Sequence, residues 1–340
     1  MRLLRWTSVL PVLLAFSASN PALAANAGNF YKGKTVNLIV GFSAGGGYDQ
    51  YTRLLGRHIA KHIPGHPDIV VNNMPGASGL KAVQYLDAGA AKDGTVIVSY
   101  NSGLITQSMT LPEKVKVNLA NYAYVGSITE DIRICYMWAA TGVKTFAEMQ
   151  KRPKVVFGET GRGSSAYVNE RILKEIFGVH LQQVLGYPGS ADKRLAIERG
   201  ELDGDCGAYS SLSEDWLKNK KVNILIRFNQ HVAPGMSDKI PYAVDLAKDP
   251  DTKKLLKLFA ATGEVGRPYI MSRDAPKDRV DVLRAAFAAT VKDPEFLADA
   301  KKQALVVIQP MNGKEAQKAV AEIYDAPPKV IAAAKKVTGD

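Results

Sequence analysis

The chain has 340 residues, of which 46% are hydrophobic and 23% charged, and a formal net charge of +11. These proportions are those of a globular protein long enough for two domains, and they exclude disordered, collagen-like and coiled-coil chains. Because the lysines and arginines are scattered rather than gathered in one run, small anions are a better expectation than nucleic acid as the binding partner.

Residues 1–24 have the pattern of a secretory signal peptide. Arg2 and Arg5 precede an apolar stretch over residues 9–16, and small residues follow up to Ala24. A membrane anchor is the alternative, but this stretch is much shorter than the ~20 residues of a membrane span. We therefore predict cleavage near Ala24 and, for a Gram-negative source, a periplasmic protein. Export also argues against nucleic acid as a partner.

Strand-like and helix-like segments alternate along the chain, which is typical of α/β proteins with largely parallel sheets. From residue 276 to residue 339 the pattern becomes mainly helical, as expected of a tail that packs on a core formed earlier in the chain. The predicted strands lie near residues 35–40, 68–72, 95–100, 122–127, 132–138, 154–157, 182–186, 203–208, 222–228, 268–272 and 304–309.

A loop with glycines at positions 45, 46 and 47 follows the first of these strands. The helix after it is predicted by apolar residues at four-residue intervals, namely Tyr51, Leu55, Ile59 and Ile63. A helix N-terminus exposes unpaired N–H groups, and glycine lets a ligand approach the backbone, so this loop suits a carboxylate or a phosphate. Ser43 can donate to such a ligand and Tyr48 can cover it. Asp49 either caps the helix, which we favour, or accepts a hydrogen bond from the ligand.

The same pattern of strand, glycine-rich loop and helix occurs a second time, with the loop over residues 158–165. The hydroxyls of Thr160, Ser164 and Ser165 are candidate donors in this loop. Arg162 is either a bidentate partner of a carboxylate or a solvent-exposed arginine. Two such units about one domain apart suggest two lobes that each present a helix N-terminus to a shared ligand.

Motifs for catalysis, cofactors and metals are missing from the sequence. Neither glycine loop matches the dinucleotide or P-loop pattern, so we expect no cofactor. His58 and His62 stand one helical turn apart without the glutamate of a zinc-binding H-E-x-x-H motif, which favours a surface pair over a metal site. No nucleophile elbow is present, and nothing places the acidic residues near 201–205 across a cleft as an acid/base pair. We therefore predict a protein that is not an enzyme.

The two cysteines, Cys135 and Cys206, both lie in strand-like segments. In an oxidising compartment they could form one disulfide that closes a long loop, and the alternative is a pair of buried thiols.

Several segments together resemble one family, the Bug-type solute receptors of tripartite tricarboxylate transporters. The resemblance rests on GFSAGGGYD at 41–49, VVNNMPGASGLKA at 70–82, GRGSSAYV at 161–168 and VLGYPGSADKRLAIERGELD at 184–203. A further similar segment, PKDRVDVLRAAFAATVKDPEF, spans 276–296. These segments follow the family's order over nearly all of the chain after the signal peptide.

The resemblance implies a type II periplasmic binding-protein fold, with two α/β lobes and a ligand cleft between them. It also implies a small carboxylate ligand, held through backbone amides and hydroxyls, and a membrane permease as partner. Its binding positions carry over to Phe42, Ser43, Ala44, Gly45, Gly46 and Asp49 in one lobe and to Thr160, Gly161, Gly163 and Ser164 in the other. With Tyr48, Asn101, Arg162, Tyr187 and Asp205, these residues make up our candidate ligand-binding set.

The chain departs from the family pattern at four positions. Gly41, Tyr48, Tyr167 and Pro188 stand where the family has proline, a small polar residue, histidine and lysine. The loss of a lysine and the gain of two tyrosines make a bulkier or aromatic carboxylate conceivable.

The expected organisation is a signal peptide at 1–24, lobe 1 at 25–126, lobe 2 at 127–250, and a return to lobe 1 with C-terminal helices at 251–340. We expect a monomeric receptor without enzymatic activity. Two alternatives remain open, a periplasmic α/β enzyme acting on an anionic substrate and a receptor that signals through a sensor protein.

Overall fold

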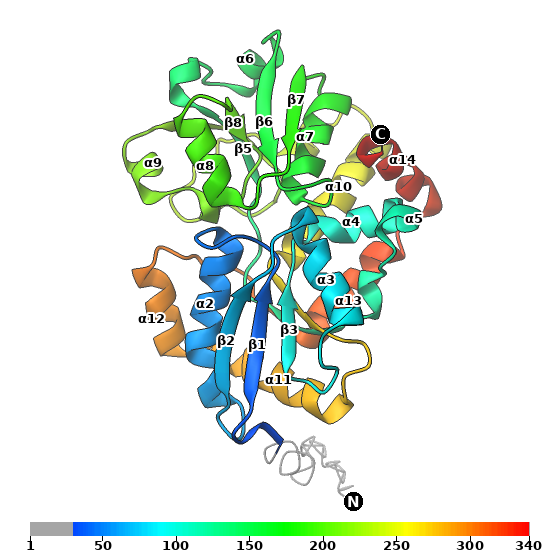
Figure 1. The fold of residues 1–340 in the computed structure, drawn as a ribbon. Helices are drawn as coiled ribbons and strands as arrows, with labels where there is room; N and C mark the ends of the chain where they lie inside the picture. The colour runs from blue at the N-terminus through cyan, green and yellow to red at the C-terminus, as the bar shows by residue number, and fades with distance from the viewer. Residues whose placement is uncertain (1–29, 340) are drawn as a thin grey trace, which may run out of the picture.

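The computed structural model describes residues 30–339, so the predicted signal peptide lies outside the described part of the chain. In that part the strands form two sheets, each at the centre of its own lobe (Figure 1). We call the lobe with the six-stranded sheet lobe 1 and the lobe with the five-stranded sheet lobe 2. The predicted two-lobed α/β architecture is therefore confirmed.

The sheet of lobe 1 has the strand order β11-β4-β10-β3-β1-β2. Strands β1, β2 and β3 are parallel, and β10 runs antiparallel between β3 and β4. Because β10 is the strand that comes back from the other lobe, it enters the sheet from the opposite end. The strands are β1 Thr35–Val40, β2 Asp68–Asn73, β3 Val96–Ser99, β4 Ala123–Ser127, β10 Pro268–Met271 and β11 Met311–Asn312.

Lobe 2 repeats this plan with the order β7-β6-β8-β5-β9. Strand β6 is parallel to β7 and β8, while β5, which enters from lobe 1, is antiparallel to β8 and β9. In both sheets the incoming strand thus sits antiparallel in the same relative place. The strands are β5 Ile134–Trp138, β6 Val155–Glu159, β7 Leu181–Leu185, β8 Gly204–Asp205 and β9 Val222–Arg227.

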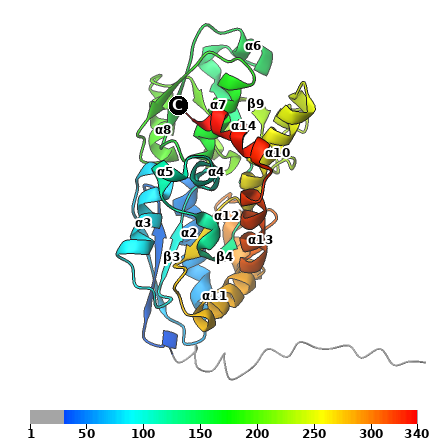
Figure 2. The ribbon, with the colours of Figure 1, turned by 90° about the vertical axis from the view of Figure 1, so that its right-hand side faces the viewer.

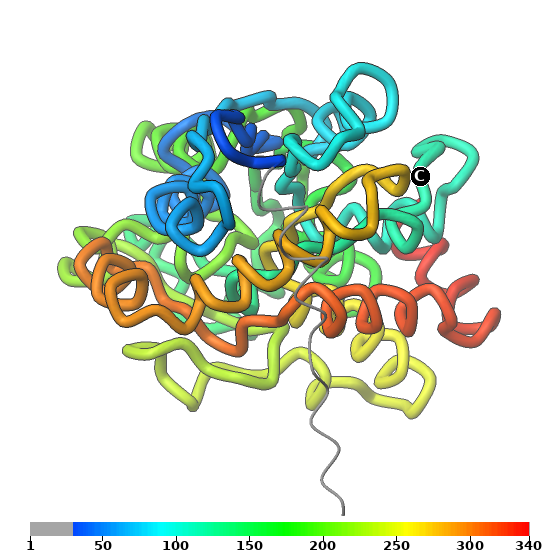
Figure 3. Tube along the Cα trace, turned by 90° about the horizontal axis from the view of Figure 1, so that it is seen from below, coloured from blue at the N-terminus to red at the C-terminus, as the bar shows by residue number. Residues whose placement is uncertain are grey.

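Helices cover both faces of each sheet, and alternating apolar residues of the strands bury against them. In lobe 1, α2, α11 and α12 pack on one face and α3 and α13 on the other. Figure 3 shows α2, in blue, beside the orange α12, although far apart in sequence. The helices of lobe 1 are α2 Gly47–Ile59, α3 Leu80–Ala88, α4 Gly103–Thr110, α5 Pro112–Val115, α11 Lys277–Thr290, α12 Pro294–Lys302 and α13 Gly313–Tyr324.

In lobe 2, α6 and α7 share one core with the sheet, and α8 and α9 share another on the opposite face. The helices of this lobe are α6 Phe146–Gln150, α7 Ser165–Glu175, α8 Ser190–Glu198 and α9 Glu214–Lys218. Within residues 30–339, no helix combines the length and apolar character that crossing a bilayer requires.

Two further helices, α10 Pro250–Val265 and α14 Pro328–Thr338, lie where the lobes meet (Figure 2). Helix α14 packs against α4 of lobe 1 and against α7 of lobe 2. Arg171 of α7 also donates to the backbone oxygen of Val337 at 2.7 Å. The end of the chain therefore bridges both lobes.

The sequence left two possibilities open for the cysteines, and the structure has the disulfide: Cys135 in β5 is bonded to Cys206, just after the neighbouring strand β8. Of the predicted strands, the one at 304–309 is wrong: this stretch is not a strand, and β11 begins at Met311. The backbone oxygens of Val306 and Ile308 accept hydrogen bonds from Thr129 and Glu130 in the first crossing between the lobes. The backbone oxygens of this extended segment are thus hydrogen-bonded to the chain that crosses between the lobes, and not to a neighbouring strand.

Candidate ligand site between the lobes

The loops that follow parallel strands of both lobes converge at the boundary between the lobes. In lobe 1 these loops follow β1 and β3, and in lobe 2 they follow β6 and β8. Ligand sites of open α/β sheets form at such strand ends. Here the loops enclose a cavity lined by Phe42, Tyr48, Asn101, Arg133, Glu159, Thr160, Ser164, Ala166, Ser190, Lys193, Asp205, Gly207, Ala208, Ser211 and Arg267.

The first glycine loop makes direct contact with lobe 2. The hydroxyl of Ser43 donates to a carboxylate oxygen of Asp192 at 2.8 Å, and its backbone N–H donates to the oxygen of Pro188 at 3.3 Å. Arg194 donates to the backbone oxygen of Gly45 at 3.3 Å. Ser43, Ala44, Gly45 and Gly46 do not line the cavity. The loop therefore bonds the two lobes together.

Asp49 secures this loop from behind. Its carboxylate accepts from the backbone N–H of Gly45 at 2.9 Å, from the amide of Asn73 at 2.8 Å and from Arg53 at 3.0 Å. Burial alone would raise the pKa of Asp49, but these hydrogen bonds hold it below its ordinary value. Asp49 does not line the cavity, so its carboxylate shapes the loop at the start of α2.

The second glycine loop is also held from both lobes. Ser164, the N-cap of α7, accepts from the backbone N–H of Tyr167 at 2.8 Å and donates to the carboxylate of Glu159. The side-chain oxygen of Asn101 accepts from the backbone N–H and the hydroxyl of Ser165, at 2.8 and 2.7 Å. The hydroxyls of Ser78 and Thr160 lie 3.0 Å apart. Both helix N-termini thus lie at the boundary between the lobes.

An aromatic and cationic stack forms one wall of the cavity. The rings of Phe42 and Tyr48 are stacked with centroids 4.7 Å apart, and the guanidinium of Arg267 lies 4.6 Å from the centroid of Tyr48. Burial raises the pKa of Tyr48, so its hydroxyl stays protonated. That hydroxyl makes a long hydrogen bond of 3.4 Å to the backbone oxygen of Gly266. Tyr48 therefore contributes mainly its ring.

Two arginines share one carboxylate beside this stack. Arg267 donates to one oxygen of Asp131 at 3.3 Å, and Arg133 donates to the other at 3.1 Å. Arg267 also donates to the hydroxyl of Ser210 at 2.8 Å, and Arg133 to the backbone oxygen of Cys206 at 2.8 Å. All three charged side chains are buried.

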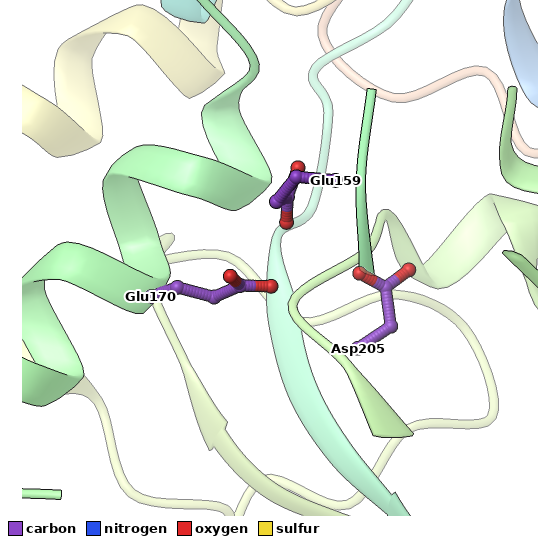
Figure 4. Close-up of side chains that lie close together, drawn as sticks. All are labelled: Glu159, Glu170 and Asp205. Atoms are coloured by element: carbon purple, nitrogen blue, oxygen red, sulfur yellow. The ribbon is translucent and has the colours of Figure 1, made fainter. Parts of the chain in front are cut away.

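Two carboxylates, Glu159 and Asp205, line the cavity from lobe 2, and a third, Glu170, lies close to both. Oxygens of Glu159, Glu170 and Asp205 all lie within 4.8 Å of one another (Figure 4). Burial and then the neighbouring Glu159 raise the pKa of Glu170 well above its ordinary value, so its neutral form is favoured in the folded chain. The ammonium of Lys193 lies 2.6 Å from Asp205 and 4.0 Å from Glu159. Since this ammonium already supplies a cation, the group is better described as an internal ion network than as a metal site.

The structure brings only part of the sequence-derived candidate set together. Phe42, Tyr48, Asn101, Thr160, Ser164 and Asp205 line the cavity. Tyr187 lies in an adjacent opening with Phe42 and Thr160. Gly161, Arg162 and Gly163 do not line the cavity, and Arg162 is exposed.

The sequence reasoning missed the basic residues of the cavity, Arg133, Lys193 and Arg267, and the hydroxyls of Ser190 and Ser211. One signal was visible: Arg133 interrupts the apolar run IRICYMW, and a charged residue in such a run needs a buried partner. Arg267 could have been recognised in the same way, because it is a charged residue that directly precedes the apolar strand β10.

Comparisons with known proteins agree on the fold. No protein-family model and no curated protein sequence matches the chain. Among solved structures, the periplasmic binding protein BugD is 20% identical, with a TM-score of 0.71 over 90% of this chain and 98% of BugD. MatC of Rhodopseudomonas palustris with bound malate is 20% identical, with a TM-score of 0.72 over 90% of this chain and 99% of MatC.

A second R. palustris protein, solved with adipate, is 19% identical, with a TM-score of 0.70 over 90% of this chain and 97% of its own. These likenesses cover nearly all the described residues in both lobes and agree with the resemblance seen in the sequence motifs. The chain therefore has the two-lobed α/β fold of the Bug-type periplasmic binding proteins.

Proposed function

We propose that the chain is an exported solute-binding receptor that captures a small carboxylate between its lobes and delivers it to a membrane permease. The observation that carries this proposal is the cavity at the lobe boundary, which three buried basic side chains line: Arg133, Lys193 and Arg267. Buried cations next to a cavity favour an anionic ligand. Malate and adipate, which two proteins of the same fold carry, belong to the same chemical class.

Capture would occur by closure of the lobes. Hydrogen bonds such as Ser43 to Asp192 and Asn101 to Ser165 form only when the lobes meet. A ligand that bridges the lobes adds contacts to this closed form and so shifts the population towards it. The permease would then recognise the closed arrangement of the two lobes.

We further propose that the receptor acts as a monomer in the periplasm, with a permease of the tripartite tricarboxylate type as partner. Few large apolar side chains among residues 30–339 are exposed, and they stand on separate elements, whereas interfaces between subunits usually need a contiguous apolar patch. They are Val70, Leu185, Leu195, Leu246 and Leu297. Light scattering during size exclusion would test the monomeric state, and a dimeric mass would contradict it.

A thermal-shift screen of the chain without residues 1–24 tests the central proposal. The screen would contain C4–C6 dicarboxylates, tricarboxylates, aromatic acids and amino acids, with the corresponding neutral amides as controls. A ligand at 100 times its Kd adds about 2.7 kcal/mol to the free energy of unfolding. We expect at least one acid, and none of the amides, to raise the melting temperature. If no carboxylate does so, the proposal is wrong.

Product analysis after incubation with each binder separates the receptor from the enzyme alternative. A receptor returns the acid unchanged, whereas conversion of the acid would show an enzyme. Uptake of the acid by cells that lack the receptor gene would then show whether transport depends on the protein. Normal uptake with a lost transcriptional response would favour a partner sensor over a permease.

A further inference from the structure

The three basic groups of the cavity differ in how their charges are compensated. The ammonium of Lys193 lies between two carboxylates, Asp205 at 2.6 Å and Glu159 at 4.0 Å. The guanidiniums of Arg133 and Arg267 share the single carboxylate of Asp131. The arginine pair therefore carries an excess positive charge, while Lys193 is fully compensated by its neighbours.

The arginine pair also keeps hydrogen-bond donors unused. Nε and Nη1 of Arg267, and Nε of Arg133, are buried and have no hydrogen-bond partner within residues 30–339. Arg267 is only 1% exposed, so these N–H groups cannot turn to bulk water. An unpaired buried donor on a charged group is costly, and a planar fork of N–H groups matches the two oxygens of a carboxylate. Both observations point to an anion that completes the pair.

We propose that Arg133 and Arg267 form the anion subsite of the cavity and take a carboxylate group of the ligand directly. This inference rests on the proposed function and specifies which residues hold the acidic group. It moves the anion away from the two glycine loops, where the hydroxyls of Ser43, Thr160 and Ser165 already bond to the opposite lobe. In this arrangement the glycine loops hold the two lobes together, and the arginines bind the carboxylate of the ligand.

The surroundings of Arg267 are built around its guanidinium. The rings of Tyr48 and Tyr51 each have their centroid 4.6 Å from it, which fixes the plane of the group. Gly47 allows close approach of the α2 backbone, because a Cβ there would lie 2.8 Å from Nη2 and 3.1 Å from Nη1. A side chain at this position would force both the guanidinium and the hydroxyl of Ser211, 2.7 Å from the Cβ, to shift.

The position of the pair in the chain links the subsite to movement of the lobes. Arg133 directly precedes β5, where the chain enters lobe 2, and Arg267 directly precedes β10, where it re-enters lobe 1. Asp131, which joins the two arginines, donates its own backbone N–H to the oxygen of Gly263 at 2.9 Å. A carboxylate at the subsite would therefore contact both connections between the lobes at once.

Formate, the smallest carboxylate, can probe the subsite whatever the natural ligand is. We expect formate to raise the melting temperature of the wild-type chain above its value in chloride at equal ionic strength, and Arg267→Gln to abolish this difference. For any acid found in the screen, Arg267→Gln should weaken binding at least tenfold, which corresponds to about 1.4 kcal/mol. Arg267→Lys, which keeps the charge but loses the fork, should give an intermediate affinity.

Arg273→Gln is the matched control, because Arg273 also pairs with a carboxylate, Asp87 at 3.2 Å, and lies over a tyrosine ring, Tyr122. It stands at the other end of β10, outside the cavity, and should keep the response to formate. Circular dichroism would verify that each variant folds. If Arg267→Gln does not fold, the response of Arg267→Lys to formate decides the test. The subsite is refuted if formate stabilises no protein, or stabilises the Arg267 variants as much as the wild type. If a screened acid binds wild type and Arg267→Gln equally well, the receptor function stands and the subsite alone fails.

Discussion

The hydroxyl of Ser43 in lobe 1 donates a hydrogen bond of 2.8 Å to the carboxylate of Asp192 in lobe 2. Ser43 belongs to the first glycine loop, and Asp192 lies in the first turn of α8. The loop that the sequence suggested as a ligand clamp is thus bonded to the opposite lobe. The strength of this contact should decide how long the lobes stay together.

Ser43→Ala should destabilise the closed form by about 1 kcal/mol, the typical net value of one hydrogen bond. We expect a roughly fivefold weaker affinity for any acid from the screen, since 1.4 kcal/mol corresponds to tenfold. Small-angle scattering should show a larger mean radius of gyration. Ser237→Ala, at an exposed serine of lobe 2, is the control and should change neither quantity. An unchanged affinity in Ser43→Ala would show that the loop does not hold the lobes.

Tyr48 should act through its ring and not through its hydroxyl. The ring stacks between Phe42 and Arg267, whereas the hydroxyl makes only a long contact of 3.4 Å to Gly266. We expect Tyr48→Phe to keep the affinity for the acid. Tyr48→Ala should lower it about tenfold, because the guanidinium loses a cation–π partner and becomes hydrated. Calorimetric titration would measure both, with Tyr85→Ala on α3 as control. Equal losses in the two Tyr48 variants would show that the hydroxyl matters instead.

The disulfide between Cys135 and Cys206 should stabilise lobe 2 substantially. The two cysteines are 71 residues apart, and closing a loop of this length in the unfolded chain contributes about 4 kcal/mol. We expect the double variant Cys135→Ala, Cys206→Ala to lower the midpoint of urea unfolding strongly. Reduction of the wild-type chain should have a similar effect. A midpoint unchanged by either treatment would mean that the bond adds no stability.

Glu170 should make stability fall as pH rises. Burial and Glu159 raise its pKa well above the ordinary 4.5, so the folded chain keeps a proton that the unfolded chain releases. The folded state then binds more protons, and the free energy of unfolding declines from about pH 4.5 up to the folded-state pKa. Glu170→Gln mimics the protonated form and should flatten this decline.

Urea unfolding at about pH 5 and about pH 8 would measure the effect of this substitution. Glu175→Gln is the matched control, because Glu175 ends the same helix but is partly exposed and paired with Arg171. It should leave the pH profile of the wild type intact. A Glu170→Gln profile as steep as that of the wild type would assign the dependence to other groups.

Much of the fold could be predicted from local periodicity. Tyr51, Leu55, Ile59 and Ile63 recur every four residues, and all four are fully buried beneath the sheet of lobe 1. The two glycine loops also indicated where the lobes meet, because loops after parallel strands gather at one end of a sheet. The strand predicted from the apolar pattern at 304–309 was wrong. That segment is extended, but its backbone is hydrogen-bonded to Thr129 and Glu130 in the first crossing and not to a strand.

The inner wall of the cavity could not be predicted in this way. Arg133 and Arg267 are 134 positions apart in the sequence. They meet only because the chain crosses between the lobes twice. Their common partner Asp131 lies two residues from Arg133, yet nothing local indicates that a second guanidinium reaches it. Lys193 likewise stands on the buried side of α8, and its partner Asp205 comes from another element. Long-range pairing of charges is a property of the fold and not of a sequence window.

The amide oxygen of Asn101 lies against the N-terminus of α7, where the sequence suggested that a carboxylate would bind. An amide satisfies the exposed N–H groups without bringing a charge. Three further contacts between the lobes, Ser78 with Thr160, Ser43 with Asp192 and Arg194 with Gly45, likewise pair hydroxyls or join one charge to a neutral group. Dissolved salt screens attraction between opposite charges far more than it weakens neutral hydrogen bonds. The closed arrangement should therefore persist over a wide range of ionic strength.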